Sequence, residues 1–152
     1  MQRMSHIVTL FLIIFFIPFD VQAYEEKVLT NVNTFKDEIS KYDTVWVMYT
    51  FIAVKRGEYQ ENANKFWNLL KKEFGKQVDA YIVVNTSFWS KEDVMRTYDN
   101  EVGERRAPSF VLYKNGKVVN EGTDDDVRIV GAPTSEHRPL FIEEIKKVSF
   151  LK

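Results

Sequence analysis

The sequence predicts an α/β domain with a mixed sheet of about four or five strands and helices on both faces of that sheet. A continuous apolar segment at 45–51 precedes a long amphipathic segment at 58–74, and a second apolar segment follows at 78–84. This order predicts a β-α-β unit with parallel strands and a right-handed crossover. Pro108 then precedes an apolar segment that ends in Asn115-Gly116. This dipeptide favours a tight antiparallel hairpin because both residues tolerate positive φ.

The first expected helix covers 31–42, with Asn31 or Asn33 as its N-cap, because several apolar side chains share one of its faces. These side chains are Val32, Phe35 and Ile39. The segment at 45–51 reads VWVMYTF. It does not alternate between apolar and polar residues, which is typical of a strand buried on both faces.

The second expected helix, at 58–74, has one apolar face and ends before Gly75, which can serve as its C-cap. That face consists of Ala63, Phe66, Trp67, Leu70 and Phe74. A second buried strand, VDAYIVV, is expected at 78–84. A short helix is expected at 91–98, where the side chain of Ser90 can cap the first turn.

The last expected elements are the hairpin after Pro108, a strand at 127–130 and a closing helix at 139–148. An acidic loop at 122–126 joins the hairpin to the last strand. Proline has no backbone N–H, so Pro108 has to lie at the start or the edge of the sheet. The side chains expected to point inward from the closing helix are Leu140, Phe141, Ile145 and Val148.

Residues 1–23 are expected to be a signal peptide, and residues 24–152 a single domain. Arg3 provides the positive charge, the apolar run at 7–19 is too short to span a bilayer, and small residues before position 24 suit signal peptidase. A retained membrane anchor is the alternative. Cleavage after Ala23 would place the domain in the secretory pathway, either extracellular or in an organelle or periplasmic lumen, without stable membrane insertion.

The composition excludes several classes of function. The 152-residue chain has a formal net charge of −1, so it lacks the electrostatic footprint of a protein that binds DNA or RNA. It has no cysteine, which excludes thiol chemistry, thiolate metal sites and disulfide exchange. Removal of residues 1–23 would leave His137 as the single histidine, so a site built from several histidines is excluded too. No metal or cofactor is therefore expected, and His137 is expected to be structural.

The order of elements, together with the stretch APSFVLYKNGKVV, resembles the thioredoxin superfamily. The family pattern is a proline, a small polar residue, an apolar strand with a phenylalanine or tyrosine, and an Asn-Gly-type turn. Pro108, Ser109, the segment at 110–113 and Asn115-Gly116 match it. The resemblance covers nearly all of residues 24–152. It implies a thioredoxin-like fold, a cis peptide bond before Pro108, and a neighbouring surface that holds extended peptides.

The sequence departs from this family at the redox site. Thioredoxins carry a Cys-x-x-Cys motif where the first central strand meets its helix, and this chain has IAVKRGEYQ there. Gapless counting from the strand puts 54–57 at the redox positions, whereas counting back from Phe74 puts 57–60 there, and both alignments stay open. The strand VWVMYTF also lacks the buried carboxylate of active members. The resemblance therefore implies a redox-inactive member and no oxidoreductase activity.

The remaining function that this resemblance implies is binding of a protein or an extended peptide. Lys55 and Arg56 make the loop after the first central strand locally basic, and Tyr59 adds aromatic surface. The residues expected to contact a peptide are Val54, Lys55, Arg56, Gly57, Tyr59, Ala107 and Pro108. We expect a secreted, non-enzymatic binding or chaperone-like module, or an accessory subunit of a secretory or protein-export complex.

Other functions are open on the sequence alone. A cysteine-independent enzyme that handles glutathione or another small molecule would have only Tyr49, Thr50 or Tyr59 as hydroxyl groups near the loop. A third alternative is a purely structural dimerisation or scaffold unit. Asn85 begins an Asn-Thr-Ser glycosylation sequon, which would be used only in a eukaryotic secretory pathway and only if exposed.

Overall fold

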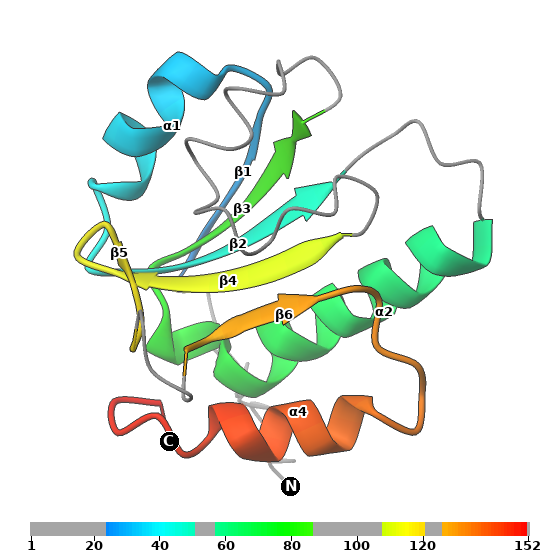
Figure 1. The fold of residues 1–152 in the computed structure, drawn as a ribbon. Coiled ribbons are helices and arrows are strands. Elements are labelled where there is room, and N and C mark those ends of the chain that lie inside the picture. The colour runs from blue at the N-terminus through cyan, green and yellow to red at the C-terminus, as the bar shows by residue number, and fades with distance from the viewer. Residues whose placement is uncertain (1–23, 51–56, 87–107, 121–125, 152) are drawn as a thin grey trace, which may run out of the picture.

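The computed structural model describes residues 24–50, 57–86, 108–120 and 126–151. They form one sheet with α1 on one face and α2 and α4 on the other (Figure 1). The elements in chain order are β1 (Glu25–Leu29), α1 (Val32–Ile39), β2 (Thr44–Thr50), α2 (Gly57–Phe74), the 3₁₀ helix η1 (Gly75–Gln77), β3 (Ala80–Asn85), β4 (Ser109–Lys114), β5 (Lys117–Val118), β6 (Arg128–Val130) and α4 (Arg138–Ile145). The helix expected at 91–98 lies outside the described residues.

The strand order of the sheet is β1-β3-β2-β4-β5, and β6 also pairs with β4. β1, β3 and β2 are parallel, whereas β4 runs antiparallel to β2, β5 and β6. In the central register Val47 lies between Ile82 on β3 and Val111 on β4. The predicted mixed sheet, its parallel β-α-β unit and the hairpin after Pro108 are therefore confirmed.

The continuous apolar character of β2 follows from its central position in the sheet. All seven of its residues are buried. Val45, Val47 and Tyr49 belong to the core under α1, and Trp46 and Met48 belong to the core under α2 and α4. Successive side chains of a strand point to opposite faces, so a strand covered on both faces needs apolar residues at every position. The prediction that this segment is buried on both faces is confirmed.

Helices α1 and α2 match the sequence prediction closely. Asn31 is the N-cap of α1, because its side-chain oxygen accepts a hydrogen bond from the N–H of Asn33 at 2.9 Å. Phe35 and Ile39 on α1 are buried, as expected. The predicted apolar face of α2 is buried at every position: Ala63, Phe66, Trp67, Leu70 and Phe74.

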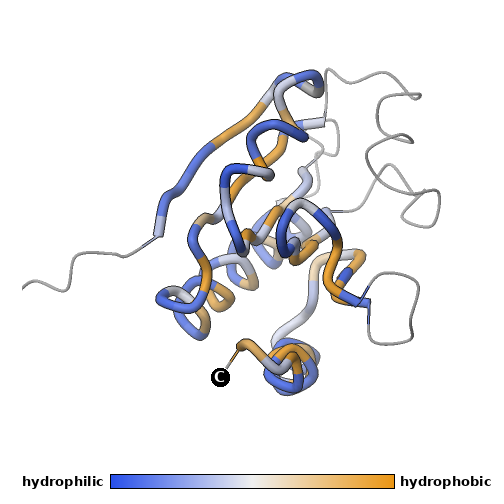
Figure 2. Tube along the Cα trace, turned by 90° about the vertical axis from the view of Figure 1, so that its left-hand side faces the viewer, coloured by the Kyte–Doolittle hydropathy of each residue, from blue (hydrophilic) through white to orange (hydrophobic). Residues whose placement is uncertain are grey.

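The first strand, β1, is absent from the sequence prediction and makes the sheet six-stranded. Its sequence EEKVL begins with three charged residues, and Figure 2 shows a hydrophilic first half followed by a hydrophobic second half. A strand at the edge of a sheet tolerates charged residues, which also discourage pairing with another chain. The ring of Tyr24, just before β1, packs edge-on against Tyr81 with centroids 4.7 Å apart.

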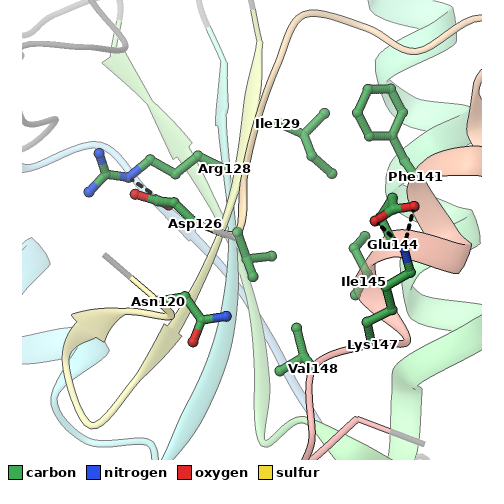
Figure 3. Close-up of a pocket in the computed structure, with 10 residues that line it drawn as sticks. Asn120, Asp126, Arg128, Ile129, Phe141, Glu144, Ile145, Lys147 and Val148 are labelled. Carbon is green, nitrogen blue, oxygen red and sulfur yellow. Dashed lines mark hydrogen bonds and ion pairs between the residues drawn. The ribbon is translucent and has the colours of Figure 1, made fainter. Parts of the chain in front are cut away.

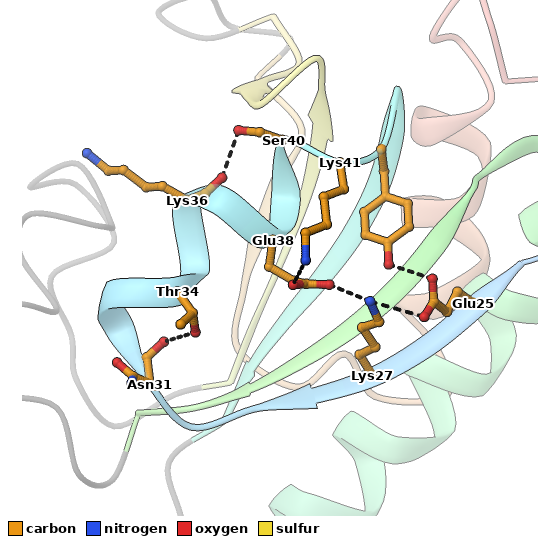
Figure 4. Close-up of polar contacts among 9 residues, drawn as sticks. Glu25, Lys27, Asn31, Thr34, Lys36, Glu38, Ser40 and Lys41 are labelled. Carbon is orange, nitrogen blue, oxygen red and sulfur yellow. Dashed lines mark hydrogen bonds and ion pairs between the residues drawn. The ribbon is translucent and has the colours of Figure 1, made fainter.

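A polar network joins β1 to α1 (Figure 4). The carboxylate of Glu38 on α1 accepts hydrogen bonds from Lys27 on β1 and from Lys41. The hydroxyl of Tyr42 donates to Glu25 at 2.6 Å, and Lys27 also pairs with Glu25 at 3.0 Å. These contacts supply polar partners that a strand this hydrophilic could not obtain from the apolar core.

Gly75 does not act as the left-handed C-cap that the sequence suggests. The chain continues from α2 directly into η1, and Gly75 does not have positive φ. Its lack of a side chain serves packing instead, because a Cβ at this position would lie 3.0 Å from Cε1 of Tyr24. The signal for a helix end was correct, but the reason for the glycine is tertiary.

The closing helix α4 and the residues just after it bury most of the expected face: Ile145 and Val148 are buried, and Phe141 is half-buried against the core. Ile142 is buried as well, whereas the side chain of Leu140 is 64% exposed, so its predicted inward orientation is wrong. Leu140 precedes Ile142 by two residues, and residues two apart point to nearly opposite sides of a helix. Pro139 does lie in the first turn, as expected.

Candidate functional site

The candidate site lies at the end of the sheet where α2 begins (Figure 1). Strand β2 ends at Thr50 and β3 at Asn85, whereas β4 starts at Ser109 and α2 starts at Gly57. Pro108 immediately precedes β4, so it belongs to the same end. The carboxyl ends of parallel strands are where ligands bind in most open α/β sheets.

Pro108 is a buried residue that joins β4 to the end of β6. Its carbonyl oxygen accepts a hydrogen bond of 2.8 Å from the N–H of Gly131. The proline immediately precedes β4, outside the paired register of β2 and β4, and this confirms its predicted placement at the start of the strand. The bond before it includes Ala107, which lies outside the described residues, so the expected cis isomer stays a prediction.

Tyr59 comes from the first turn of α2 and lies against Gly131. A Cβ built on Gly131 would be 3.4 Å from the Tyr59 hydroxyl oxygen. Gly131 has φ +99, a left-handed conformation that residues with a side chain rarely adopt. The tertiary structure therefore brings Tyr59, Gly131 and Pro108 together from three different elements.

Of the other residues expected to contact a peptide, the structure describes only Gly57. Gly57 is the exposed first residue of α2, with open space around the position of a Cβ. Val54, Lys55, Arg56 and Ala107 lie outside the described residues, so their roles stay predictions. Neither alignment of the lost redox motif is excluded, because α2 begins at the one residue that both alignments share.

Gly131 is a site residue that the sequence analysis missed. A glycine directly after a predicted strand is a signal for positive φ, and it could have been used here. The proximity of Gly131 to Tyr59 could not be deduced in this way, because it depends on how β6 and α2 pack.

Arg138 fixes the segment that carries Gly131 against α2. Its Nη2 donates to Oδ1 of Asn62 at 2.7 Å, and its Nε donates to the carbonyl oxygen of Pro133 at 3.1 Å. A guanidinium with two bonds of fixed geometry holds a loop more firmly than a single contact does. The connection from β6 to α4 is therefore anchored on the helix that also supplies Tyr59.

The structure places two of the three candidate hydroxyl groups away from a surface. Tyr49 is buried under α1, where its hydroxyl lies 2.7 Å from that of Tyr113. Thr50 is buried, and its Oγ1 donates to the carbonyl oxygen of Val84 at 3.5 Å. Tyr59 is thus the one of the three candidate hydroxyl-bearing residues that is not buried.

The strand before the site carries no acid. Met48 is 3% exposed and lies opposite Phe110 in the core under α2. With no cysteine in the chain, the site has no sulfur nucleophile, and β2 supplies no buried acid that could move a proton.

Two further residues that the sequence analysis singled out, Asn85 and His137, have polar neighbours close to them in the chain or the sheet. Asn85 is half-buried at the end of β3, and the neighbouring Thr86 hydroxyl donates to the carbonyl oxygen of Thr50 at 3.0 Å. Ser87 of the sequon lies outside the described residues, so glycosylation stays a prediction. His137 is exposed, and its Nδ1 lies 2.8 Å from Oγ1 of Thr134 in the turn before α4.

The described part of the chain contains neither a metal-binding cluster nor a membrane-spanning helix. Its His, Asp and Glu side chains form no group of three or more that could hold a metal ion. Among the same residues, no helix has the length and apolar character needed to cross a membrane.

The comparisons with known proteins support the fold. No family model and no curated protein matches this sequence. Among solved structures, thioredoxin f2 of Chlamydomonas reinhardtii aligns over 85% of this chain and 99% of its own, with a TM-score of 0.54 and 18% identity. A Schistosoma mansoni thioredoxin (TM-score 0.51, 19% identity, 78% of this chain and 97% of its own) and a Malassezia sympodialis thioredoxin (0.51, 16%, 79% and 93%) are also similar.

The chain therefore has a thioredoxin-like fold, as the sequence implied. Within that fold it is a redox-inactive variant, because a chain without cysteine has no thiol with which to exchange disulfides.

Proposed function

We propose that this protein binds an extended segment of another protein, without covalent chemistry, at the Pro108 face. The Pro108 face presents Gly57, Tyr59 and Gly131 at the surface, and it is named for the buried Pro108 to which Gly131 is bonded. In this proposal the protein acts in the secretory pathway after removal of residues 1–23. It serves there as a chaperone-like module or as an accessory subunit of a secretory or export complex.

The observation that carries the proposal is the contact of Tyr59 with Gly131, which is itself bonded to Pro108. A glycine in a left-handed conformation keeps side-chain atoms away from the surface beside Tyr59. Backbone of another chain could approach closely there, and the aromatic ring would offer apolar contact. Arg138 holds the arrangement in place before any partner arrives, which lowers the entropic cost of binding.

The first test is affinity capture from the native source with residues 24–152 as bait, followed by quantitative mass spectrometry. Tyr59→Ala should reduce recovery of the captured partners by roughly tenfold, about 1.4 kcal/mol, because the ring lies on the face. Tyr42→Ala is the matched control, since Tyr42 is also half-buried but lies beside β1. Equal recovery with wild type and Tyr59→Ala would contradict the Pro108 face as the binding site.

The pattern of captured proteins separates the two roles. A few proteins in stoichiometric amounts indicate a subunit of an assembly, whereas many weak, unfolded clients indicate a chaperone-like role. The glutathione alternative is tested separately by calorimetric titration of glutathione into wild type and Tyr59→Phe. Binding that Tyr59→Phe abolishes would favour that enzyme class over the proposal.

A further inference from the structure

A cavity of about 400 Å³ lies between β6 and α4 (Figure 3). This volume is in the range of pockets that hold a bulky side chain or a small molecule. We refer to it as the β6–α4 cavity. It is lined by Asn120, Asp126, Val127, Arg128, Ile129, Phe141, Glu144, Ile145, Lys147 and Val148. None of these residues belongs to the Pro108 face.

The lining of the β6–α4 cavity is about half apolar and half polar. Val127 and Ile129 contribute from the strand side, and Phe141, Ile145 and Val148 from the helix side, with Ile129 and Phe141 facing each other across the space (Figure 3). The charged residues of the lining carry both signs. Lys147 pairs with Glu144 at 2.7 Å on the helix side, whereas the side chains of Arg128 and Asp126, which pair at 3.4 Å, point to the other side of β6 from Ile129 (Figure 3). An occupant with an apolar centre and polar flanks suits this distribution.

Strand β6 presents its outer edge beside the same cavity. The N–H of Gly131 donates to the carbonyl oxygen of Pro108, so these two residues form a hydrogen-bonded pair. Such pairs alternate along an antiparallel ladder, and Val130 with its partner Ser109 is the next pair, without hydrogen bonds between them. The N–H and C=O of Val130 therefore point away from β4, towards the side where the described part of the sheet has no further strand.

We propose that an extended peptide segment of a partner protein adds to the outer edge of β6 and places one bulky apolar side chain in the β6–α4 cavity. Backbone hydrogen bonds to Val130 would supply affinity, and the cavity would select the side chain. An aromatic anchor fits best, because the half-buried ring of Phe141 lines the cavity and already meets Phe66 edge-on at 6.1 Å, so a further ring could extend this cluster. The residue next to the anchor on the peptide would lie opposite Val130, as strand alternation requires.

An extended peptide accounts for two features that other occupants leave unused. A small apolar molecule would fill the cavity without using the edge of β6, and a helical partner has no free backbone groups to offer Val130. The inference does not depend on the proposed function, because the two surfaces share no residue.

The test uses NMR titration of ¹⁵N-labelled protein, residues 24–152, with the peptide acetyl-Lys-Thr-Val-Phe-Val-Thr-Lys-amide. We expect saturable shifts of the Ile129 and Val130 amide signals. Shifts at Tyr59 and Gly131 alone would place the peptide on the Pro108 face and overturn the inference. The absence of saturable shifts at millimolar peptide would overturn it as well.

Two control peptides test the chemistry without altering the protein. Replacement of the phenylalanine by aspartate removes the apolar anchor, and N-methylation of both valines blocks the backbone hydrogen bonds. Each change should weaken binding at least about tenfold, which corresponds to roughly 1.4 kcal/mol. If either peptide binds as well as the parent, then the anchor or the edge pairing is not used, and the inference fails.

Protein variants then locate each interaction. Val148→Phe fills the cavity from its wall, and Val130→Pro removes the outward N–H without removing a ladder bond to β4. Both should weaken binding at least about tenfold, whereas the matched Val130→Ala, which keeps the N–H, should stay within about threefold of wild type. Equal affinities of Val130→Pro and Val130→Ala would contradict strand addition. Circular dichroism confirms that each variant is folded.

Discussion

Lys27 on β1 and Glu38 on α1 form an ion pair that connects an edge strand to the helix above it (Figure 4). The side chain of Glu38 is only 12% exposed, so its charge depends on the two lysines around it. β1 is the most hydrophilic strand of the sheet, and this contact helps to explain why it nevertheless joins the fold.

The ion pair predicts how stability depends on pH. Hydrogen bonds from Lys27 and then Lys41 hold the pKa of Glu38 below its ordinary value of 4.5. A carboxylate with a lowered folded-state pKa stabilises the protein above its unfolded pKa, and that contribution is lost as pH falls through the folded value. We expect the thermal midpoint to fall below about pH 4.5, and Glu38→Gln to make this fall shallower.

The measurement is calorimetric unfolding between about pH 7 and pH 2. Part of the fall should remain in Glu38→Gln, because the pKa of Glu25 is also lowered, first by Tyr42 and then by Lys27. Glu136→Gln is the control, since Glu136 is exposed and in no ion pair among the described residues. An unchanged slope in Glu38→Gln would refute the assigned role of this carboxylate.

Core packing predicts that two apolar residues on the α2 and α4 side of the sheet contribute very differently to the free energy of unfolding. Phe66 is fully buried, and its ring meets that of Phe110 at 4.9 Å, whereas Leu140 is 64% exposed. Phe66→Ala should lower the free energy of unfolding by about 3–5 kcal/mol through lost burial and a cavity. Leu140→Ala should change it by no more than about 0.5 kcal/mol. Urea denaturation of both variants checks this, and comparable losses would mean that α4 packs differently.

The left-handed conformation of Gly131 predicts a cost for any side chain there. Gly131→Val should destabilise the protein by about 1–3 kcal/mol, because valine disfavours positive φ and its Cβ would meet the Tyr59 hydroxyl. Gly57→Ala is the matched glycine control. It has open space around the new Cβ and should be neutral or stabilising by up to about 1 kcal/mol. Chemical denaturation of the two variants tests the difference, and a neutral Gly131→Val would refute the strain argument.

Removal of the first 23 residues predicts a defined mass for the mature protein. Intact mass spectrometry of protein from the native source should correspond to residues 24–152. Tyr24 should be retained, because its ring packs on Tyr81 and over Gly75 and a shorter chain would lose these contacts. A mass that includes residues 1–23 would instead favour the retained membrane anchor.

The elements with a strong hydrophobic period could be predicted from the sequence. Both the buried face of α2 and the two-sided burial of β2 follow from side-chain periodicity alone. β1 could not be found in this way, because contacts such as those of Lys27 with Glu38 on α1 and of Glu26 with Lys71 on α2 exist only in the folded chain. Leu140 was misassigned because four apolar residues in one short helix fit more than one face.

The sequence by itself therefore determined the fold class, the hairpin after Pro108 and the absence of any thiol in the chain. Periodicity and turn preferences act between near neighbours, so the sequence could be interpreted at that level. The tertiary structure decided which distant residues meet, such as Tyr59 with Gly131, and Ile129 with Phe141 across the β6–α4 cavity. These pairings depend on how the helices pack on the sheet. A pattern among neighbouring residues does not contain that information.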